Sequence, residues 1–187
     1  MRGLDARLVA LPFALVLMSA VPADQVIALP GLEGEAIVIA HNSPVHFRGW
    51  SKNDVAHFSG KFVLAGTYSY GCEFCDDWPI KTDELSLKIV PDAAMASRLP
   101  HWKLRSGHRG IFIDASKSLN RTIGTPDELR ALKAGKIDDI HGRVSVLVDH
   151  FDAAIECDGA AYSAKLVAVV KRPTVQRNKL DGSYGCV

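Results

Sequence analysis

The feature that most restricts the fold of this chain is a run of alternating side chains from Phe58 to Tyr70. Its even positions are large and apolar or glycine, and its odd positions are small or polar. A period of two places the two sets on opposite faces of a β-strand. Four further segments alternate in the same way, at 85–89, 111–113, 140–149 and 162–171. The chain is therefore predicted to be mainly β, with five strands.

One short helix is predicted between the third and fourth of these segments. Thr125 has the character of an N-cap, Pro126 suits the first helical position, and Glu128 can bond back to the amide of the cap. Leu129 and Leu132 then form an apolar stripe, Lys133 suits the C-terminal end, and Gly135 can close the helix in the left-handed conformation. The predicted order is three strands, a helix and two strands.

This order resembles that of the OB-fold, a small five-stranded, partly open barrel. Gly60, Gly66 and Gly142 lie on the face predicted to point inward, where glycine often marks a barrel corner. The resemblance implies an OB-fold-like β-barrel domain over residues 58–171; a small β-sandwich with one helix is the alternative. Residues 24–57 form an N-terminal extension, in which 36–40 can add a strand, and residues 172–187 form a C-terminal tail.

The N-terminus has the features of a secretory signal peptide. Two arginines precede an apolar run from Leu8 to Ala20, and small or aliphatic residues follow up to Ala23. The run is shorter than the roughly 20 apolar residues that span a bilayer. We therefore expect cleavage after Ala23, export to the periplasm or the medium, and no transmembrane segment in the mature chain.

The four cysteines are expected to form disulfides, because an exported chain meets an oxidising compartment. Two of them, Cys72 and Cys186, end the same tetrapeptide, Ser-Tyr-Gly-Cys. Four cysteines allow three pairings, including a bond between these two. A chain reversal at 172–173 would bring Cys186 toward Cys157. We predict the pairs Cys72–Cys75 and Cys157–Cys186, and we read the repeated tetrapeptide as coincidence or as two similar turns.

Two other functions for these cysteines are less favoured by their surroundings. A redox-active Cys72–Cys75 pair needs a thiol at a helix N-terminus, which lowers its pKa. Asp76 and Asp77 would act against such a shift, and Pro79 would break an early helix. A zinc site is disfavoured because Cys157 and Cys186 are not close in the sequence.

The link between the second and third predicted strands is the most distinctive candidate for ligand binding. Residues 98–109 hold four permanently basic side chains, two histidines and one tryptophan, and no acid. Guanidinium groups pair with phosphate or carboxylate, and an indole offers a stacking face. The candidate contacts to an anionic glycan or lipid headgroup are Trp102, Lys103, Arg105 and Arg109. The alternative is a solvated loop whose tryptophan covers one end of the barrel.

Composition and motifs exclude several functions. Removing residues 1–23 takes away two arginines and one aspartate, so the mature chain is electrically balanced, which argues against nucleic-acid binding. The sequence has no nucleophile elbow, no phosphate-binding glycine loop and no helical metal-site spacing among its seven histidines. We expect an exported, non-enzymatic binding or structural module without a metal or cofactor. The alternative is a small exported enzyme, either a thiol oxidoreductase or a hydrolase.

Overall fold

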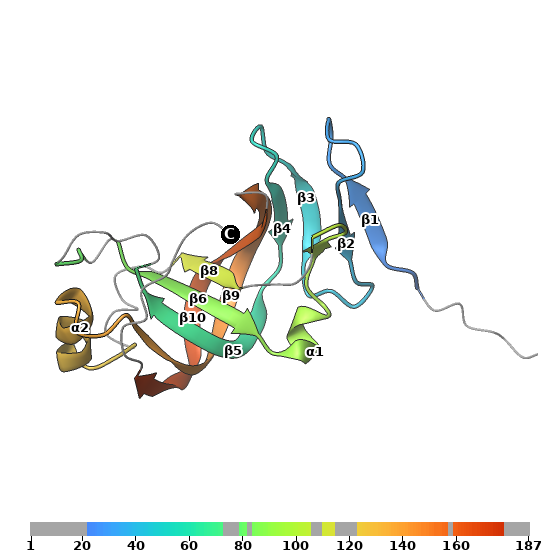
Figure 1. The fold of residues 1–187 in the computed structure, drawn as a ribbon. Coiled ribbons are helices and arrows are strands. Elements are labelled where there is room, and N and C mark those ends of the chain that lie inside the picture. The colour runs from blue at the N-terminus through green and yellow to red at the C-terminus, as the bar shows by residue number, and fades with distance from the viewer. Residues whose placement is uncertain are drawn as a thin grey trace, which may run out of the picture.

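The computed structural model describes residues 22–72, 79–81, 84–105, 110–114, 123–156 and 159–177. The N-terminal part contains β1 (Gln25–Ala28), β2 (Ala36–Ile39), β3 (His46–Trp50) and β4 (Ala56–Ser59). The middle part contains β5 (Phe62–Gly71), β6 (Ser86–Pro91), α1 (Ala93–Ala96), β7 (His101–Trp102) and β8 (Ile111–Asp114). The last part contains α2 (Pro126–Lys133), β9 (Asp139–Glu156) and β10 (Gly159–Arg177). The protein is mainly β, as predicted, and α2 follows β8 and precedes β9 (Figure 1).

Seven strands form one sheet in the order β10-β8-β6-β5-β9-β4-β3, with a further pairing between β10 and β9. Five of them are joined in a cycle of pairings: β5 with β6, β6 with β8, β8 with β10, β10 with β9, and β9 with β5. Only the β8–β10 pairing among these is parallel. We call these five strands the ring.

The long strand β9 joins the ring to the N-terminal part of the chain. Its first half, from Asp139 to Val148, pairs with β5, and its second half, from Phe151 to Ala153, pairs with β4. Between the two halves His150 has a φ of 52°, in the left-handed region. This local change of direction lets one strand serve both regions.

Three short strands, β1, β2 and β7, form a separate sheet that we call the N-terminal sheet. It reaches the rest of the molecule through Trp102 of β7, whose indole Nε1 donates to the carbonyl of Ala154 in β9 at 3.0 Å. The backbone N–H of Trp102 also donates to the hydroxyl of Tyr162 in β10, at 3.2 Å. Its ring centroid lies 5.9 Å from that of Trp50 in β3. These contacts, which we call the Trp102 joint, tie the two sheets together.

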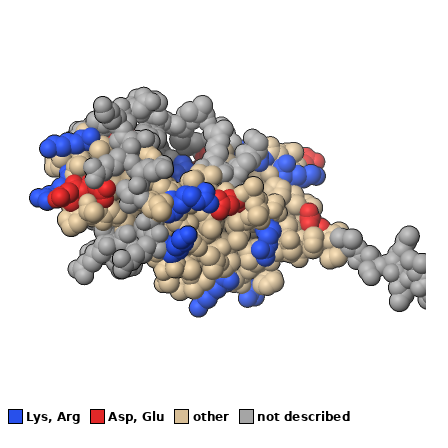
Figure 2. All heavy atoms as spheres, turned by 90° about the horizontal axis from the view of Figure 1, so that it is seen from below, with Lys and Arg blue, Asp and Glu red and all other residues tan. Residues whose placement is uncertain are grey.

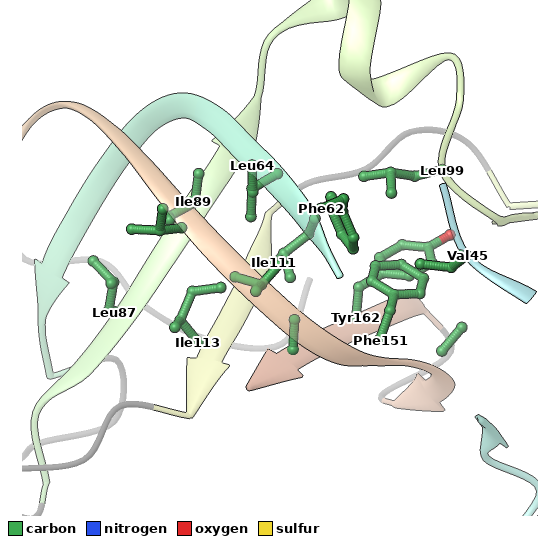
Figure 3. Packing of buried hydrophobic residues seen from close by; sticks show 14 of the residues in the cluster. Val45, Phe62, Leu64, Leu87, Ile89, Leu99, Ile111, Ile113, Phe151 and Tyr162 are labelled. Atoms are coloured by element: carbon green, nitrogen blue, oxygen red, sulfur yellow. The ribbon is translucent and has the colours of Figure 1, made fainter. Parts of the chain in front are cut away.

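The buried side chains form one hydrophobic cluster with two kinds of packing. Inside the ring Leu64, Ile89 and Ile111 point toward one another (Figure 3). Toward the N-terminal part the core becomes aromatic, with Phe151 stacked on Tyr162 at 5.8 Å between ring centroids. The predicted inward positions are confirmed in β5 and in β9 from 140 to 148, where the even residues are buried. In β10 the even residues Ala168 and Val170 are exposed, because the register against β9 shifts beside them, so the predicted alternation fails there.

Three glycines explain how the chain turns within this sheet. Gly60, with a φ of 142°, separates β4 from β5, so the single strand predicted from Phe58 is two strands. A Cβ on Gly66 would lie 2.0 Å from the carbonyl oxygen of Val90, and one on Gly142 would lie 1.6 Å from that of Thr174. Neighbouring backbone therefore occupies the space that any other side chain would need.

The predicted helix is confirmed as α2. Thr125 accepts a hydrogen bond from the amide of Glu128, and the Glu128 carboxylate accepts one from the amide of Thr125, so the predicted capping box is present. Gly135 follows the helix with a φ of 67°, the left-handed conformation expected of it. The helix α1, which begins at Ala93, was not predicted, and no side chain caps it.

Two predicted segment assignments are wrong. The chain does not reverse at 172–173, because β10 continues to Arg177 and passes these residues with a shift of register against β9. The first residues of the predicted tail are therefore part of a strand. The predicted N-terminal extension contains β1 and β3 in addition to the one expected strand, β2.

Among the described residues visible from below, charged side chains of one sign do not gather into a large area (Figure 2). Lys and Arg side chains are spread over a mostly uncharged surface, with Asp and Glu at fewer places (Figure 2). Within the described part of the chain, no helix is long and apolar enough to cross a membrane.

Candidate functional site

The structure does not support Trp102 as a stacking platform for a ligand. The indole is fully buried in the Trp102 joint, with a relative exposure of 0%. Both its ring N–H and its backbone N–H are used in hydrogen bonds to β9 and β10. The prediction that Trp102 contacts a ligand is therefore wrong: the residue fastens the N-terminal sheet to the rest of the protein.

Of the other predicted contacts the structure describes Lys103 and Arg105, and Arg105 is paired with an acid. Arg105 Nη2 lies 2.8 Å from Glu35 Oε1, in an ion pair whose side chains are 20% and 11% exposed. Lys103 is exposed, and its backbone amide donates to the carbonyl of Ala36. Arg109 lies outside the described residues. The sequence missed the pairing of Arg105 because its acidic partner is 70 residues away.

A different set of polar side chains comes together on the outer face of the ring. They line a groove of about 490 Å³ over β5, β6 and β9, which also reaches β10. Ser69 pairs across the sheet with Lys88 on one side and with His141 on the other, and Thr67 lies between Val90 and Arg143. The lining residues are Thr67, Tyr68, Ser69, Lys88, Val90, His141, Gly142, Arg143 and Thr174.

Asp139 organises the polar end of this groove. Its Oδ2 accepts a hydrogen bond from the hydroxyl of Ser69 at 2.6 Å, and its Oδ1 lies 3.2 Å from Nδ1 of His141. The His141 and Asp139 side chains are 22% and 15% exposed. The carboxylate holds both neighbours in a fixed orientation and directs the other ring nitrogen of His141 away from itself.

This network contains a serine, a histidine and an aspartate, but not in the order of a catalytic triad. In a triad the histidine lies between the other two and takes the proton of the serine. Here Ser69 donates directly to Asp139, and the same carboxylate holds His141. Ser69 is therefore not activated as a nucleophile, whereas the imidazole is oriented by a carboxylate.

The remaining charged groups of the groove are held by neighbours. Arg143 Nη2 lies 2.7 Å from both carboxylate oxygens of Asp92, an exposed pair at the rim. The ammonium group of Lys88 lies 4.9 Å from the centroid of the Phe112 ring in β8. The groove thus offers hydroxyl groups, an imidazole and cations, and the Asp139 carboxylate lies at its end in the adjoining hollow.

Tyr68 forms part of the lining of the groove and is itself buried. Burial and, to a smaller extent, the charges of Glu128 and Asp139 together raise the pKa of its hydroxyl to about 12. Among the described residues no group forms a hydrogen bond with this hydroxyl. Tyr68 is therefore neutral at physiological pH.

A smaller hollow of about 60 Å³ continues the groove toward the end of β5. It shares Ser69 and Lys88 with the groove and reaches Cys72 and Asp138. Cys72 is disulfide-bonded, and the other three cysteines lie outside the described residues. The pairing therefore stays a prediction, but the chain reversal that favoured Cys157–Cys186 is absent.

Several histidines outside the groove also lie against aspartates. His57 Nδ1 is 2.7 Å from Asp152 Oδ1 across β4 and β9, and His41 Nδ1 is 3.4 Å from Asp24 Oδ1. Throughout the described ranges, no group of three or more His, Cys, Asp or Glu side chains is placed to hold a metal ion.

The alternating pattern of two strands contains part of the information that places the groove. Thr67 and Ser69 in β5 and His141 and Arg143 in β9 are outward residues of two alternating strands. The alternation indicates that these side chains point outward. It does not indicate that β5 and β9 are neighbours, because that depends on long-range pairing.

Comparisons with models of protein families, with curated proteins and with solved structures give no match for this chain.

Proposed function

We propose that the protein is an exported binding module built on an OB-fold-like barrel. The ring of pairings supports the barrel, because it leads from β5 through β6, β8, β10 and β9 back to β5. The position of α2 in the chain, between the third and fourth strands of this ring, supports the same proposal. The apolar segment before Ala23 supports export, and the mature chain should begin at or near Asp24.

The binding site is the groove on the outer face of β5, β6 and β9. The observation that carries this proposal is the network in which Asp139 holds both Ser69 and His141. Groups fixed in this way lose little conformational entropy when a ligand binds, which favours affinity. In OB-fold proteins the barrel face around the second and third strands is the common ligand site, and Lys88 of β6 lies in this groove.

The ligand class that fits these groups is an oligosaccharide. Hydroxyl, amine, imidazole and carboxylate groups along one line can exchange hydrogen bonds with successive sugar hydroxyls. Phe112, beside Lys88 on the neighbouring strand, offers an aromatic surface at the edge of the groove. A nucleic acid is disfavoured, because the groove balances Lys88 and Arg143 with Asp139 and Asp92.

Nuclear magnetic resonance titration of the mature protein with defined hexasaccharides tests this proposal. Neutral glucose and N-acetylglucosamine oligomers and acidic galacturonate oligomers serve as probes. Binding should shift the amide signals of β5, β6 and β9 around the groove. Ser69→Ala and His141→Ala should each weaken binding roughly tenfold, the loss expected for one hydrogen bond to a polar ligand.

The matched control is His57→Ala, because His57 also lies against an aspartate on an exposed strand but outside the groove. This variant should bind the probe as the wild type does. Equal losses in His57→Ala and His141→Ala would contradict the proposal, as would the absence of groove shifts with every probe.

A second candidate is a hydrolase in which His141 acts as a general base on water. The contact between His141 Nδ1 and Asp139 favours it, since a carboxylate that orients an imidazole is half of the usual acid–base arrangement. Chromatography of the same hexasaccharides after incubation separates the two candidates. If the protein cleaves the hexasaccharides and His141→Ala abolishes cleavage, the protein is a hydrolase. Binding of the hexasaccharides without cleavage supports the binding module.

A further inference from the structure

The outer face of the ring changes character a few residues beyond the groove. Val63 in β5 is 44% exposed, and Val167 and Val170 in β10 are 46% and 58% exposed. The pairings place Val63 beside Leu147 of β9, and Leu147 beside Ala168 of β10. We call the surface formed by Val63, Leu147, Val167, Ala168 and Val170 the valine face.

Irregularities of β10 account for two of these exposed side chains. The register against β9 shifts between Leu166 and Ala168, and again between Val169 and Lys171. Val167 and Val170 fall at these shifts and have no paired residue in β9. A β-bulge changes the direction in which a side chain points, and at each of these two shifts a valine is exposed to solvent.

Lysines border the valine face at both ends. Lys61 precedes β5 and Lys165 pairs with Asp149 at one end, whereas Lys171 pairs with Ser145 at the other. All three lysines are exposed. Among the described residues of these strands, Asp149 is the acidic side chain beside the lysines. It accepts a hydrogen bond from the amide of His150 at 2.8 Å.

We propose that the valine face docks on a membrane surface that contains anionic lipids. Exposed aliphatic side chains can enter the region between headgroups and acyl chains, and lysines near an anionic surface add electrostatic attraction. The face combines these two features within three neighbouring strands. The inference does not depend on the groove having a ligand.

Other occupants fit this arrangement less well. In a symmetric dimer through the valine face both copies would contribute the same lysines, so like charges would gather in one interface. An acidic glycan would satisfy the lysines, but its hydroxylated surface has no counterpart for the valines. A bilayer of anionic lipids matches both kinds of side chain.

Co-sedimentation of the mature protein with lipid vesicles tests the proposal. Wild-type protein should bind vesicles of phosphatidylcholine with phosphatidylglycerol, and should bind phosphatidylcholine alone much less. Replacing the three valines, as Val63→Thr, Val167→Thr and Val170→Thr together, should reduce binding at least about fivefold. Lys165→Gln with Lys171→Gln should reduce it by a similar factor and lower its salt dependence.

Matched controls come from exposed residues elsewhere. Val26→Thr changes a valine of β1 that is 57% exposed, and Lys52→Gln with Lys103→Gln removes two exposed lysines that do not belong to the face. These variants should bind anionic vesicles as the wild type does. Unchanged melting midpoints in all variants would show that folding is preserved, and threonine keeps the branched shape that strands favour.

Three results would overturn the proposal. The first is equal binding to neutral and anionic vesicles, or none to either. The second is an equal loss in the control variants. The third is a dimer in light scattering that the valine replacements dissociate, which would assign the face to a second copy. Loss of vesicle binding with intact hexasaccharide binding would separate this proposal from that of the groove.

Discussion

The ring and the N-terminal sheet are encoded in the sequence in different ways. In the ring, strands such as β5 and β9 run for 10 and 18 residues, and their alternating side chains reveal the buried face locally. In the N-terminal sheet, β1, β2 and β7 have four residues or fewer, and the sheet depends on the Trp102 joint. We infer that the ring is the more stable region, and that the N-terminal sheet is held to it by Trp102 together with buried side chains such as Ile37 and Ile39.

Loss of the Trp102 indole should have the largest effect on stability. Trp102→Ala removes a fully buried side chain and its ring N–H bond to the carbonyl of Ala154, and should lower the free energy of unfolding by about 4 kcal/mol. Hydrogen exchange should accelerate mainly in β1 and β2, while the central strands of the ring stay protected.

Trp50→Ala is the matched control, because Trp50 contacts the same indole but is only partly buried. Trp50→Ala should lower the free energy of unfolding clearly less than Trp102→Ala does. Equal acceleration of exchange in both regions of Trp102→Ala would contradict the division between ring and N-terminal sheet.

The next effect belongs to the ring. Gly142→Ala would place a Cβ 1.6 Å from the carbonyl oxygen of Thr174, so β9 and β10 must separate locally. Such overpacking costs about 3 kcal/mol at the upper end of its usual range. In Gly159→Ala, the nearest atom to the new Cβ lies at an ordinary 3.4 Å, so this control should change little. Equal melting midpoints for the two variants would refute the close approach of Thr174.

Local patterns in the sequence predicted much of the ring but not the candidate site. The buried positions of β5 and β9 and the capping box of α2 depend on neighbouring residues, and these predictions are confirmed. The roles of Trp102 and Arg105 depend on partners such as Ala154 and Glu35, which no local pattern identifies. The burial of Trp102 and the pairing of Arg105 could therefore not be predicted from residues 98–109 alone.

The same limit applies to the groove. The contact of Ser69 in β5 with Asp139 in β9 requires these two strands to be neighbours. Their residues are about 70 positions apart, and pairing over that distance is set by the whole sheet. Sequence periodicity indicates which face a side chain occupies, and it leaves open which strands share that face.

Two tyrosines give a smaller and sharper test of the same comparison. Tyr162 accepts the backbone N–H of Trp102, so Tyr162→Phe leaves this buried donor without its partner and should cost about 1.5 kcal/mol. The hydroxyl of Tyr68 has no hydrogen-bond partner among the described residues, so Tyr68→Phe should leave the melting midpoint unchanged or raise it. An equal loss in both variants would contradict this assignment.

The dependence of stability on pH above 10 extends this test of Tyr68. Because the folded-state pKa of Tyr68 is raised to about 12 from its ordinary value of 10.0, stability is fully present below pH 10 and falls as the pH rises toward 12. Tyr68→Phe should remove part of this fall, as measured by urea unfolding at a series of pH values.

The smallest loss of stability is expected at α2. This helix belongs to neither sheet, and it contacts the ring through β9. Thr125→Ala removes the acceptor for the Glu128 amide, a bond of 3.3 Å, and should cost about 1 kcal/mol. The reciprocal bond, from the Thr125 amide to Glu128 Oε2 at 2.7 Å, needs no threonine side chain and should persist. Thr125→Ser keeps the cap and should have almost no effect on the midpoint of thermal unfolding. A loss several times larger in the alanine variant would mean that α2 is coupled to the ring more tightly than its single cap implies.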